Sequence, residues 1–304
     1  MANWKEIKRR IKSIENTAKI TRAMELISTV KMKRAQDTAV AKKDFVISLL
    51  EILSKMWATL KDFPLFEQEK KEEKTLWIII TSNKWLCWGY NINTFKTVNK
   101  YINENGDNID FITCWKRWAQ FIARTWFDII SDFSENFSDN MNYEFSKNIS
   151  KLFLEKFRDW TYGKIVIFYS YYVNTLVQIP MAREFLPIRK DDIERYLVWV
   201  LWQEKYDILQ NQKTKQENVY NFEPSKEEIL KEVMPMIIDM MFYDILLEAK
   251  ASEHSARMIA MKSAKDNAKK YASKLTLEYN KARQASITRE VSEIVSWVEA
   301  MKEA

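Results

Sequence analysis

The stretch ASEHSARMIAMKSAKDNAKKYASKL, residues 251–275, contains no glycine and no proline, and it repeats alanine every four residues. The alanines are Ala256, Ala260, Ala264, Ala268 and Ala272. Residues four apart share one face of an α-helix, and small side chains on that face let a second helix approach closely. No glycine or proline follows Pro235, which predicts a single helix on the order of 100 Å long. Helices of this length are typical of coiled coils.

The N-terminal region is the predicted partner of this helix. It has no glycine and no proline before Pro64. Apolar residues follow a 4-3-4 spacing and then resume on a shifted stripe, at Ile7, Ile11, Ile14, Ala18, Ile20, Met24 and Ile27. The pattern predicts a long amphipathic helix over 3–60 with a coiled-coil tendency. We expect the two helices to pack antiparallel, with the middle of the chain bridging one end.

The middle of the chain alternates apolar runs with helical patterns. The predicted strands are LWIIIT (76–81), IDFITC (109–114) and KIVIFYSYYV (164–173), with TLVQIPMARE (175–184) forming a hairpin with the third. The predicted helices are 91–104, 116–125 and 140–157, and Ser225 with Glu228 predicts a capping box at a later helix start. Alternation of this kind predicts a small, mostly parallel α/β domain.

The expected fold class is therefore α/β: a long antiparallel coiled coil of the N- and C-terminal helices plus a small central Rossmann-like α/β domain. The predicted division is an N-terminal helix over 1–62, a central foot domain over 70–200, a polar loop over 201–224 and a C-terminal helix over 225–304.

The composition argues against catalysis by this chain. Its single histidine, His254, lies within the predicted helix, which excludes a histidine triad or a multi-histidine metal site. No GxxxxGK[ST] phosphate loop occurs, no paired carboxylates stand out beyond surface charge runs, and Cys87 and Cys114 fit no metal spacing. We expect no catalytic residue, no metal and no cofactor. No apolar run approaches the roughly 18 residues of a membrane span, and the N-terminus lacks the apolar segment of a signal peptide.

The charge of the first helix leaves several functions open. Residues 1–43 hold twelve Lys and Arg against four Asp and Glu. A basic helix binds nucleic acid, an anionic surface or an acidic protein, or is simply a solvated face. One alternative is a coiled-coil interaction protein whose basic N-terminal arm binds nucleic acid, which salt-sensitive DNA binding would reveal. Another is a nucleotide-binding enzyme, although the turn after the first strand lacks GxGxxG spacing.

Three motifs resemble one family. KEIKRRIKSIENTAKITRAMELISTVKMKRAQ (5–36) resembles the N-terminal signature of the gamma subunit of F-type ATP synthase. Residues 251–295 resemble the C-terminal signature of that family, and NFEPSKEEIL (221–230) resembles its entry into the last helix. The resemblance implies a rotating central stalk. Its partners would be the hexamer of alpha and beta subunits, the epsilon subunit and the c-ring, with no nucleic acid. The membrane would be met only through the Fo sector, which implies a peripheral place on the cytoplasmic side of a bacterial plasma membrane.

The resemblance also implies contact residues. Met24, in TRAMEL, matches the methionine that faces the coupling region of the beta subunit. Arg283 and Gln284, in YNKARQASIT, match the pair that hydrogen-bonds a beta-subunit loop, and Thr288 and Glu290 continue that face. Arg289 stands where many members carry glutamine. The catalytic chemistry would belong to the beta subunits.

Tryptophan stands at positions where this family has glycine. The family typically has TSDRGLCGGYN where this chain has TSNKWLCWGYN (81–91), so the foot-domain turn consists of Trp85, Cys87, Trp88 and Gly89. Trp115, Trp118 and Trp297 match other family glycines. The chain has 3 glycines and 12 tryptophans, and together they approach ordinary glycine usage of about 7%. The hypothesis is that most of these tryptophans are glycines encoded by UGA, a codon that some bacterial lineages read as glycine. The alternative is genuine tryptophan in the core or an interface. The hypothesis predicts exposed turn positions or crowded positions for the five family-matched tryptophans.

Overall fold

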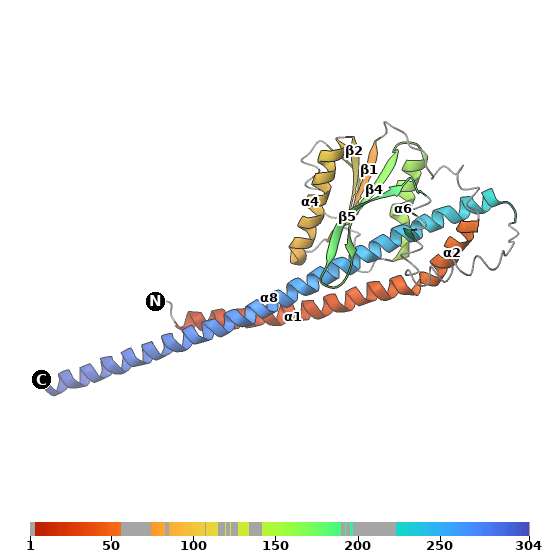
Figure 1. The fold of residues 1–304 in the computed structure, drawn as a ribbon. Helices are drawn as coiled ribbons and strands as arrows, with labels where there is room; N and C mark the ends of the chain where they lie inside the picture. Colours follow the sequence, from red (N-terminus) through yellow and green to blue (C-terminus); the bar gives the residue numbers. More distant parts are fainter. Residues whose placement is uncertain are drawn as a thin grey trace. The chain divides into compact units, whose positions relative to one another are not determined.

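The computed structural model describes most of the chain and divides it into two compact units. The described residues are 4–55, 74–82, 85–106, 108–114, 119, 122, 127–133, 142–189, 192, 195–196 and 223–303. One unit, here called the stalk unit, comprises Met1–Thr29 and Arg257–Ala304, and the other, the central unit, comprises Val30–Ala256. Helices α1 (Trp4–Ala41) and α8 (Lys226–Glu303) contribute to both units (Figure 1).

The stalk unit is an antiparallel helix pair, as the sequence predicts. Glu25 of α1 pairs with Lys265 of α8 at 2.6 Å, whereas Trp4, at the start of α1, stacks edge-on against Tyr279 with ring centroids 6.1 Å apart. The pairing therefore runs in opposite directions along the two helices. Its buried seam includes Ile7, Thr21, Ser28, Met261 and Leu275, and the alanines from 260 to 272 are half-buried. Small side chains on the seam let the two backbones approach closely.

The central unit contains a five-stranded sheet of order β3-β2-β1-β4-β5. The strands are β1 (Thr75–Ile79), β2 (Ile109–Thr113), β3 (Asp128–Asp132), β4 (Lys164–Tyr172) and β5 (Gln178–Leu186). Neighbours pair in parallel except β4 and β5, which form the predicted antiparallel hairpin. The mixed sheet between two long terminal helices confirms the predicted fold class. The prediction missed β3, a half-polar edge strand.

Helices cover both faces of this sheet. On one face, α4 (Trp88–Asn105) packs its Val98 among Trp77, Phe111 and Phe168. On the other face, α6 (Tyr143–Arg158) and the first part of α8 form the larger core. Figure 1 shows α4 and α6 on opposite sides of the strands. Because both faces are covered, β1 is apolar and buried over four of its five residues.

The predicted helix over 3–60 is interrupted. Helix α1 ends at Ala41, Lys42 adopts a turn, and α2 (Lys43–Lys55) follows. Neither glycine nor proline marks the break. The side chain of Lys42 instead forms an ion pair with Asp244 of α8 at 2.5 Å, a tertiary contact that the pattern of one helix cannot reveal. Of the predicted polar loop over 201–224, only residues 223 and 224 are among the described residues. The predicted division of the chain into four segments stays a prediction.

Helix ends follow ordinary capping chemistry at two places. The hydroxyl of Ser225 accepts a hydrogen bond from the Glu228 backbone N–H at 3.2 Å, which confirms Ser225 as the N-cap of α8. Helix α4 ends at Gly106, whose φ of 79° lies in the left-handed region. Glycine is the residue that adopts this conformation without a steric penalty.

The end of α6 has the same requirement but carries tryptophan. The Trp160 N–H bonds the Phe157 carbonyl, and the Thr161 N–H bonds the Lys156 carbonyl, each at 3.2 Å. These are the two hydrogen bonds of a Schellman motif, whose left-handed position is usually glycine. Trp160 has a φ of 59°, the one positive φ among non-glycine residues in the described ranges, and its side chain is 46% exposed.

We expect Trp160→Gly to raise the unfolding free energy by about 1 kcal/mol relative to the chain with tryptophan at position 160. Glycine relieves the left-handed strain, and little buried surface is lost. Denaturant unfolding of the full-length chain measures this difference. Trp77→Gly is the control, since Trp77 is 1% exposed between Phe111 and Phe168 and its loss should cost roughly 3–5 kcal/mol. Destabilisation by both substitutions would contradict the strain argument.

The glycine hypothesis also has a direct chemical test. Trp88 follows the turn after β1 and is 48% exposed, as the hypothesis predicts. Trp297 is 72% exposed but lies within α8 rather than at a turn, and Trp115 and Trp118 lie outside the described residues. Trp77 is packed as a genuine tryptophan would be. Tandem mass spectrometry of the native protein should find glycine at position 160 in the tryptic peptide 159–164 and at 85 and 88 in the peptide 85–96. Tryptophan at all three positions would end the hypothesis.

Candidate functional site

The predicted contact residues all belong to the stalk unit. Met24 is half-buried beside Glu25, while Arg283, Gln284, Thr288 and Glu290 are exposed. Arg283 lies 18 residues beyond Lys265, the partner of Glu25, which corresponds to roughly 27 Å of helix. The structure therefore places Met24 apart from the other four residues along the stalk. Arg283 stacks over the ring of Tyr279 at 5.9 Å, and its guanidinium remains exposed for a partner.

The foot-domain turn lies where hydrogen bonds connect the end of β1 to α8 within the central unit. Trp85 begins a 3₁₀ turn, η1 (Trp85–Cys87), although its side chain lies outside the described part. Cys87 is buried and its thiol donates to the Ser82 hydroxyl at 3.4 Å. Ser82 in turn contacts Glu253 of α8 at 3.0 Å. Trp88 and Gly89 are exposed, and a side chain at Gly89 would meet open space. The described part of the turn thus ties the end of β1 to α8.

Buried charge on α8 is the feature that the sequence prediction missed. The sequence pattern did not single out the acids of α8, yet Asp239, Asp244 and Glu253 are 6%, 5% and 3% exposed. Asp244 accepts a hydrogen bond from the Tyr196 hydroxyl besides its ion pair with Lys42, and Lys250 pairs with Glu253 at 3.0 Å. Acidic residues inside a methionine-rich apolar helix were the available signal, but their partners come from distant segments.

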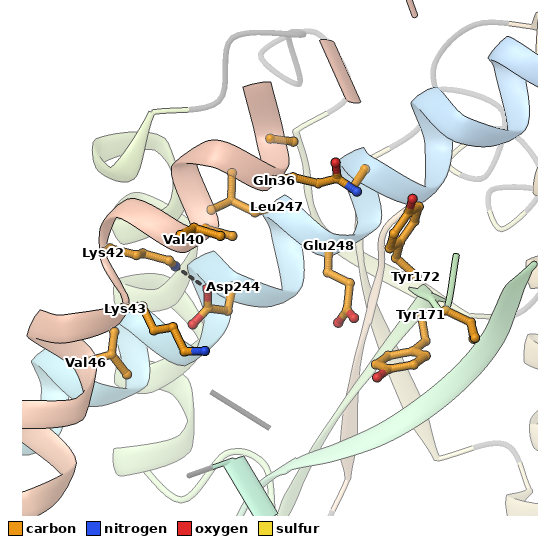
Figure 2. Close-up of a pocket in the computed structure, with 14 residues that line it drawn as sticks. Gln36, Val40, Lys42, Lys43, Val46, Tyr171, Tyr172, Asp244, Leu247 and Glu248 are labelled. Carbon is orange, nitrogen blue, oxygen red and sulfur yellow. Dashed lines mark ion pairs between the residues drawn. The ribbon is translucent and has the colours of Figure 1, made fainter. Parts of the chain in front are cut away.

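A cavity of about 620 Å³ lies beside these charges in the central unit. It is bounded by the end of α1, the start of α2, the end of β4 and α8 (Figure 2). Lys42, Lys43, Asp244, Glu248 and Tyr171 are among its lining residues. Lys42 is committed to Asp244, and Glu248 bonds the Tyr172 backbone and the Tyr169 side chain. These groups hold the fold together and do not form a nucleophile–base pair.

Metal-binding capacity, thiol reactivity and membrane-spanning length also bear on what the described part of the chain can do. Its His, Cys, Asp and Glu residues form no group of three or more that could hold a metal ion. Burial raises the pKa of Cys114 to about 12, so this thiol is unreactive at neutral pH. His254 is 2% exposed within α8. None of the described helices has an apolar stretch long enough to cross a membrane.

The whole chain matches a known protein family. The family model described as ATP synthase matches residues 3–301. Among similar proteins, the ATP synthase gamma chain of Opitutus terrae is 37% identical over 302 residues, covering 97% of this chain and 98% of the relative. That of Chloroflexus aurantiacus is 32% identical over 308 residues, covering 99% of each chain.

The chain belongs to the family of ATP synthase gamma chains. Solved structures agree in fold. A chain of the Euglena gracilis mitochondrial ATP synthase, from an OSCP/F1/c-ring structure, has a TM-score of 0.62 at 14% identity, covering 98% of this chain and 94% of its own. A chain of the Tetrahymena thermophila central stalk/c-ring structure has a TM-score of 0.55 at 20% identity, covering 81% and 99%. These comparisons give no support to the alternative of a nucleic-acid-binding coiled coil.

One buried carboxylate of this gamma-chain family member should make its stability depend on pH. Burial raises the pKa of Glu248 to about 8 from 4.5, and the Tyr172 backbone and Arg183 oppose this only in part. Between these values the folded chain holds a proton that the unfolded chain has lost, so stability falls as pH rises through about 8. We expect wild type to lose roughly 2 kcal/mol relative to Glu248→Gln between pH 6 and pH 9.

Denaturant unfolding of both full-length chains at the two pH values measures this difference, in which the contributions of the other titrating groups cancel. Glu232→Gln, at an exposed position of the same helix, is the matched control and should follow wild type. Parallel pH profiles of Glu248→Gln and wild type would show that Glu248 ionises normally.

Proposed function

We propose that this chain is the rotating central shaft of an ATP synthase, which passes torque between a hexamer of alpha and beta subunits and a membrane-embedded c-ring. The observation that carries the proposal is the match of the ATP synthase family model to residues 3–301. The Euglena chain of similar fold comes from an OSCP/F1/c-ring structure. The Tetrahymena chain of similar fold comes from a central stalk/c-ring structure. By analogy, this chain would be peripheral, on the cytoplasmic side of a bacterial plasma membrane, with the epsilon subunit beside the central unit.

The last turns of α8 support enclosure by other subunits. Residues 287–302 are all exposed. The apolar side chains among them are Ile287, Val291, Ile294, Val295, Trp297, Val298 and Met301. A row of apolar side chains in water marks a surface that a partner covers. The proposed partner is the inner surface of the alpha–beta hexamer, against which the apolar row of the tip turns without being held by strong polar bonds.

The proposed polar contacts lie just before that tip and at its start. Arg283 and Gln284 are exposed donors, and arginine suits bidentate bonding to a carboxylate of a beta-subunit loop. Thr288 and Glu290 would continue this surface, and Met24 would face the coupling region lower on the stalk. The excess of Lys and Arg in residues 1–43 complements acidic loops on the partner.

In the proposed mechanism this chain transmits torque and carries out no bond making or breaking. Ion flow through the c-ring turns the shaft, the asymmetric helix pair forces the beta subunits through successive conformations, and ATP hydrolysis reverses the motion. Bond making and breaking belong to the beta subunits. The residues of this chain bind, position and transmit torque.

Co-expression with the alpha and beta subunits of the same organism tests the proposal. The chain should co-purify with them and confer ATP hydrolysis, and the double variant Arg283→Ala, Gln284→Ala should lower that rate about tenfold by removing charge-assisted hydrogen bonds. Lys281→Ala, an exposed neighbour on α8, is the control and should change it little. A chain that purifies without alpha and beta subunits would contradict the function.

A further inference from the structure

Four acidic residues of α8 bind four different parts of the central unit. At about 100° per residue, Asp239, Asp244, Glu248 and Glu253 spread around the helix rather than along one face. Asp239 accepts a hydrogen bond from Ser150 of α6 and also bonds Tyr143, the first residue of that helix. This carboxylate therefore ties α8 to α6.

The second carboxylate ties α8 to the N-terminal segment. Asp244 pairs with Lys42, at the junction of α1 and α2, at 2.5 Å, and the Lys42 ammonium also lies 4.3 Å from the Tyr243 ring centroid. The dashed line in Figure 2 marks this pair. Tyr196 donates to the same carboxylate.

The remaining two carboxylates tie α8 to the sheet. Glu248 bonds the side chain of Tyr169 and the backbone of Tyr172, both in β4, and in Figure 2 its side chain extends from α8 toward the tyrosines of that strand. Glu253 contacts the Ser82 hydroxyl just after β1 at 3.0 Å, while Lys250, one turn earlier on α8, balances its charge at 3.0 Å.

Apolar packing alone would hold α8 less firmly. From Ile237 to Leu247 most side chains are buried in the apolar core, and apolar contact has little directional preference, so a helix can repack after a small slide or rotation. A buried acid that loses its hydrogen-bond partners carries a desolvation penalty, both when it is ionised and when, like Glu248 below about pH 8, it holds a proton. Any slide or turn of α8 would displace all four acids from their partners together.

We propose that Asp239, Asp244, Glu248 and Glu253 key α8 to the central unit, so that torque passes between them without slippage. This inference rests on the proposed rotor function. It concerns register under load rather than stability, because buried ion pairs contribute little net stability compared with apolar packing. Each of the four is a positioning residue that acts through α8.

The test uses the complete complex in sealed vesicles, with ATP-driven ion pumping measured as the opposing ion gradient grows. The variant is Glu253→Gln with Asp239→Asn, which keeps side-chain shape and removes two charges. The control is Glu232→Gln, an exposed acid on the same helix. At a large opposing gradient, set below the maximum at which net pumping stops, we expect the variant to hydrolyse about tenfold more ATP per ion moved than the control, a factor that the loss of one charge-assisted hydrogen bond already supplies. Without a gradient the two should agree.

Co-purification of the subunits checks assembly of each variant. If the double variant does not assemble, Ser82→Ala replaces it, since Glu253 then keeps its pair with Lys250. A variant that assembles and hydrolyses no more ATP per ion moved than the control at the same large gradient overturns the proposal that the four acids key α8. A wild-type complex whose hydrolysis moves no ions would instead overturn the rotor function, and the keying with it.

Discussion

Replacing Phe242 with alanine is expected to lower the unfolding free energy of the central unit by roughly 3–5 kcal/mol. The Phe242 side chain is fully buried in the larger core. Its ring lies edge-on to Phe153 of α6 at 5.2 Å and near Phe185 of β5 at 6.2 Å. Alanine removes both ring contacts and leaves a cavity where helix and sheet meet, and the close-packed neighbours can fill it only in part.

Hydrogen exchange of β1 and β4 amides in the full-length chain measures this loss, because these central strands exchange only through large openings. Met236→Ala is the matched control. Met236 is on the same helix but 40% exposed, and its truncation should cost about 0.5 kcal/mol or less. Equal effects of the two substitutions would show that α8 is not anchored through Phe242.

Lys42→Met should cost roughly 3 kcal/mol at pH 8 by leaving the Asp244 carboxylate buried without its cation. Burial already raises the pKa of Asp244, an effect that Lys42 opposes, so removal of Lys42 raises the pKa further. A carboxyl whose pKa is higher in the folded chain loses stability as pH rises. The deficit should therefore shrink as pH falls, because protonation of Asp244 removes the unpaired charge and leaves Tyr196 as its partner.

A double-mutant cycle isolates the pair. Lys42→Met with Asp244→Asn should recover at least half of the lost stability, since no unpaired charge remains. Lys33→Met, at an exposed position of α1, controls for the loss of a surface lysine. A deficit that is independent of pH and not recovered by Asp244→Asn would mean that Lys42 acts through packing of its aliphatic stem.

The elements with strong local patterns were predictable from sequence. Four of the five strands follow from apolar runs, and β4 with β5 follows from the short link between them. The strand β3, DIISD, was missed because an edge strand has few buried residues to mark it. The stalk helices and their antiparallel pairing follow from their spacing and the absence of glycine, but the register of the pairing is visible only in contacts such as Glu25 with Lys265.

The polar interior of the central unit was not predictable in the same way. Asp244 and Lys42 are 202 residues apart in sequence, and nothing local to either residue specifies the other. The break between α1 and α2 falls at Lys42, the residue that forms this long-range pair. Roles at Arg283 and Gln284 stay predictions for a different reason, since these residues are exposed and their partners belong to other subunits.

Rotation of single molecules tests the rotor function most directly. Lys100→Cys, on α4 with its side chain 76% exposed, provides an attachment point for a probe, because native Cys87 and Cys114 are buried. With the alpha–beta hexamer fixed to a surface, ATP should drive the probe around in one direction, and rotation should stop when ATP is removed. A probe that stays still while the same complexes hydrolyse ATP would contradict the rotor function.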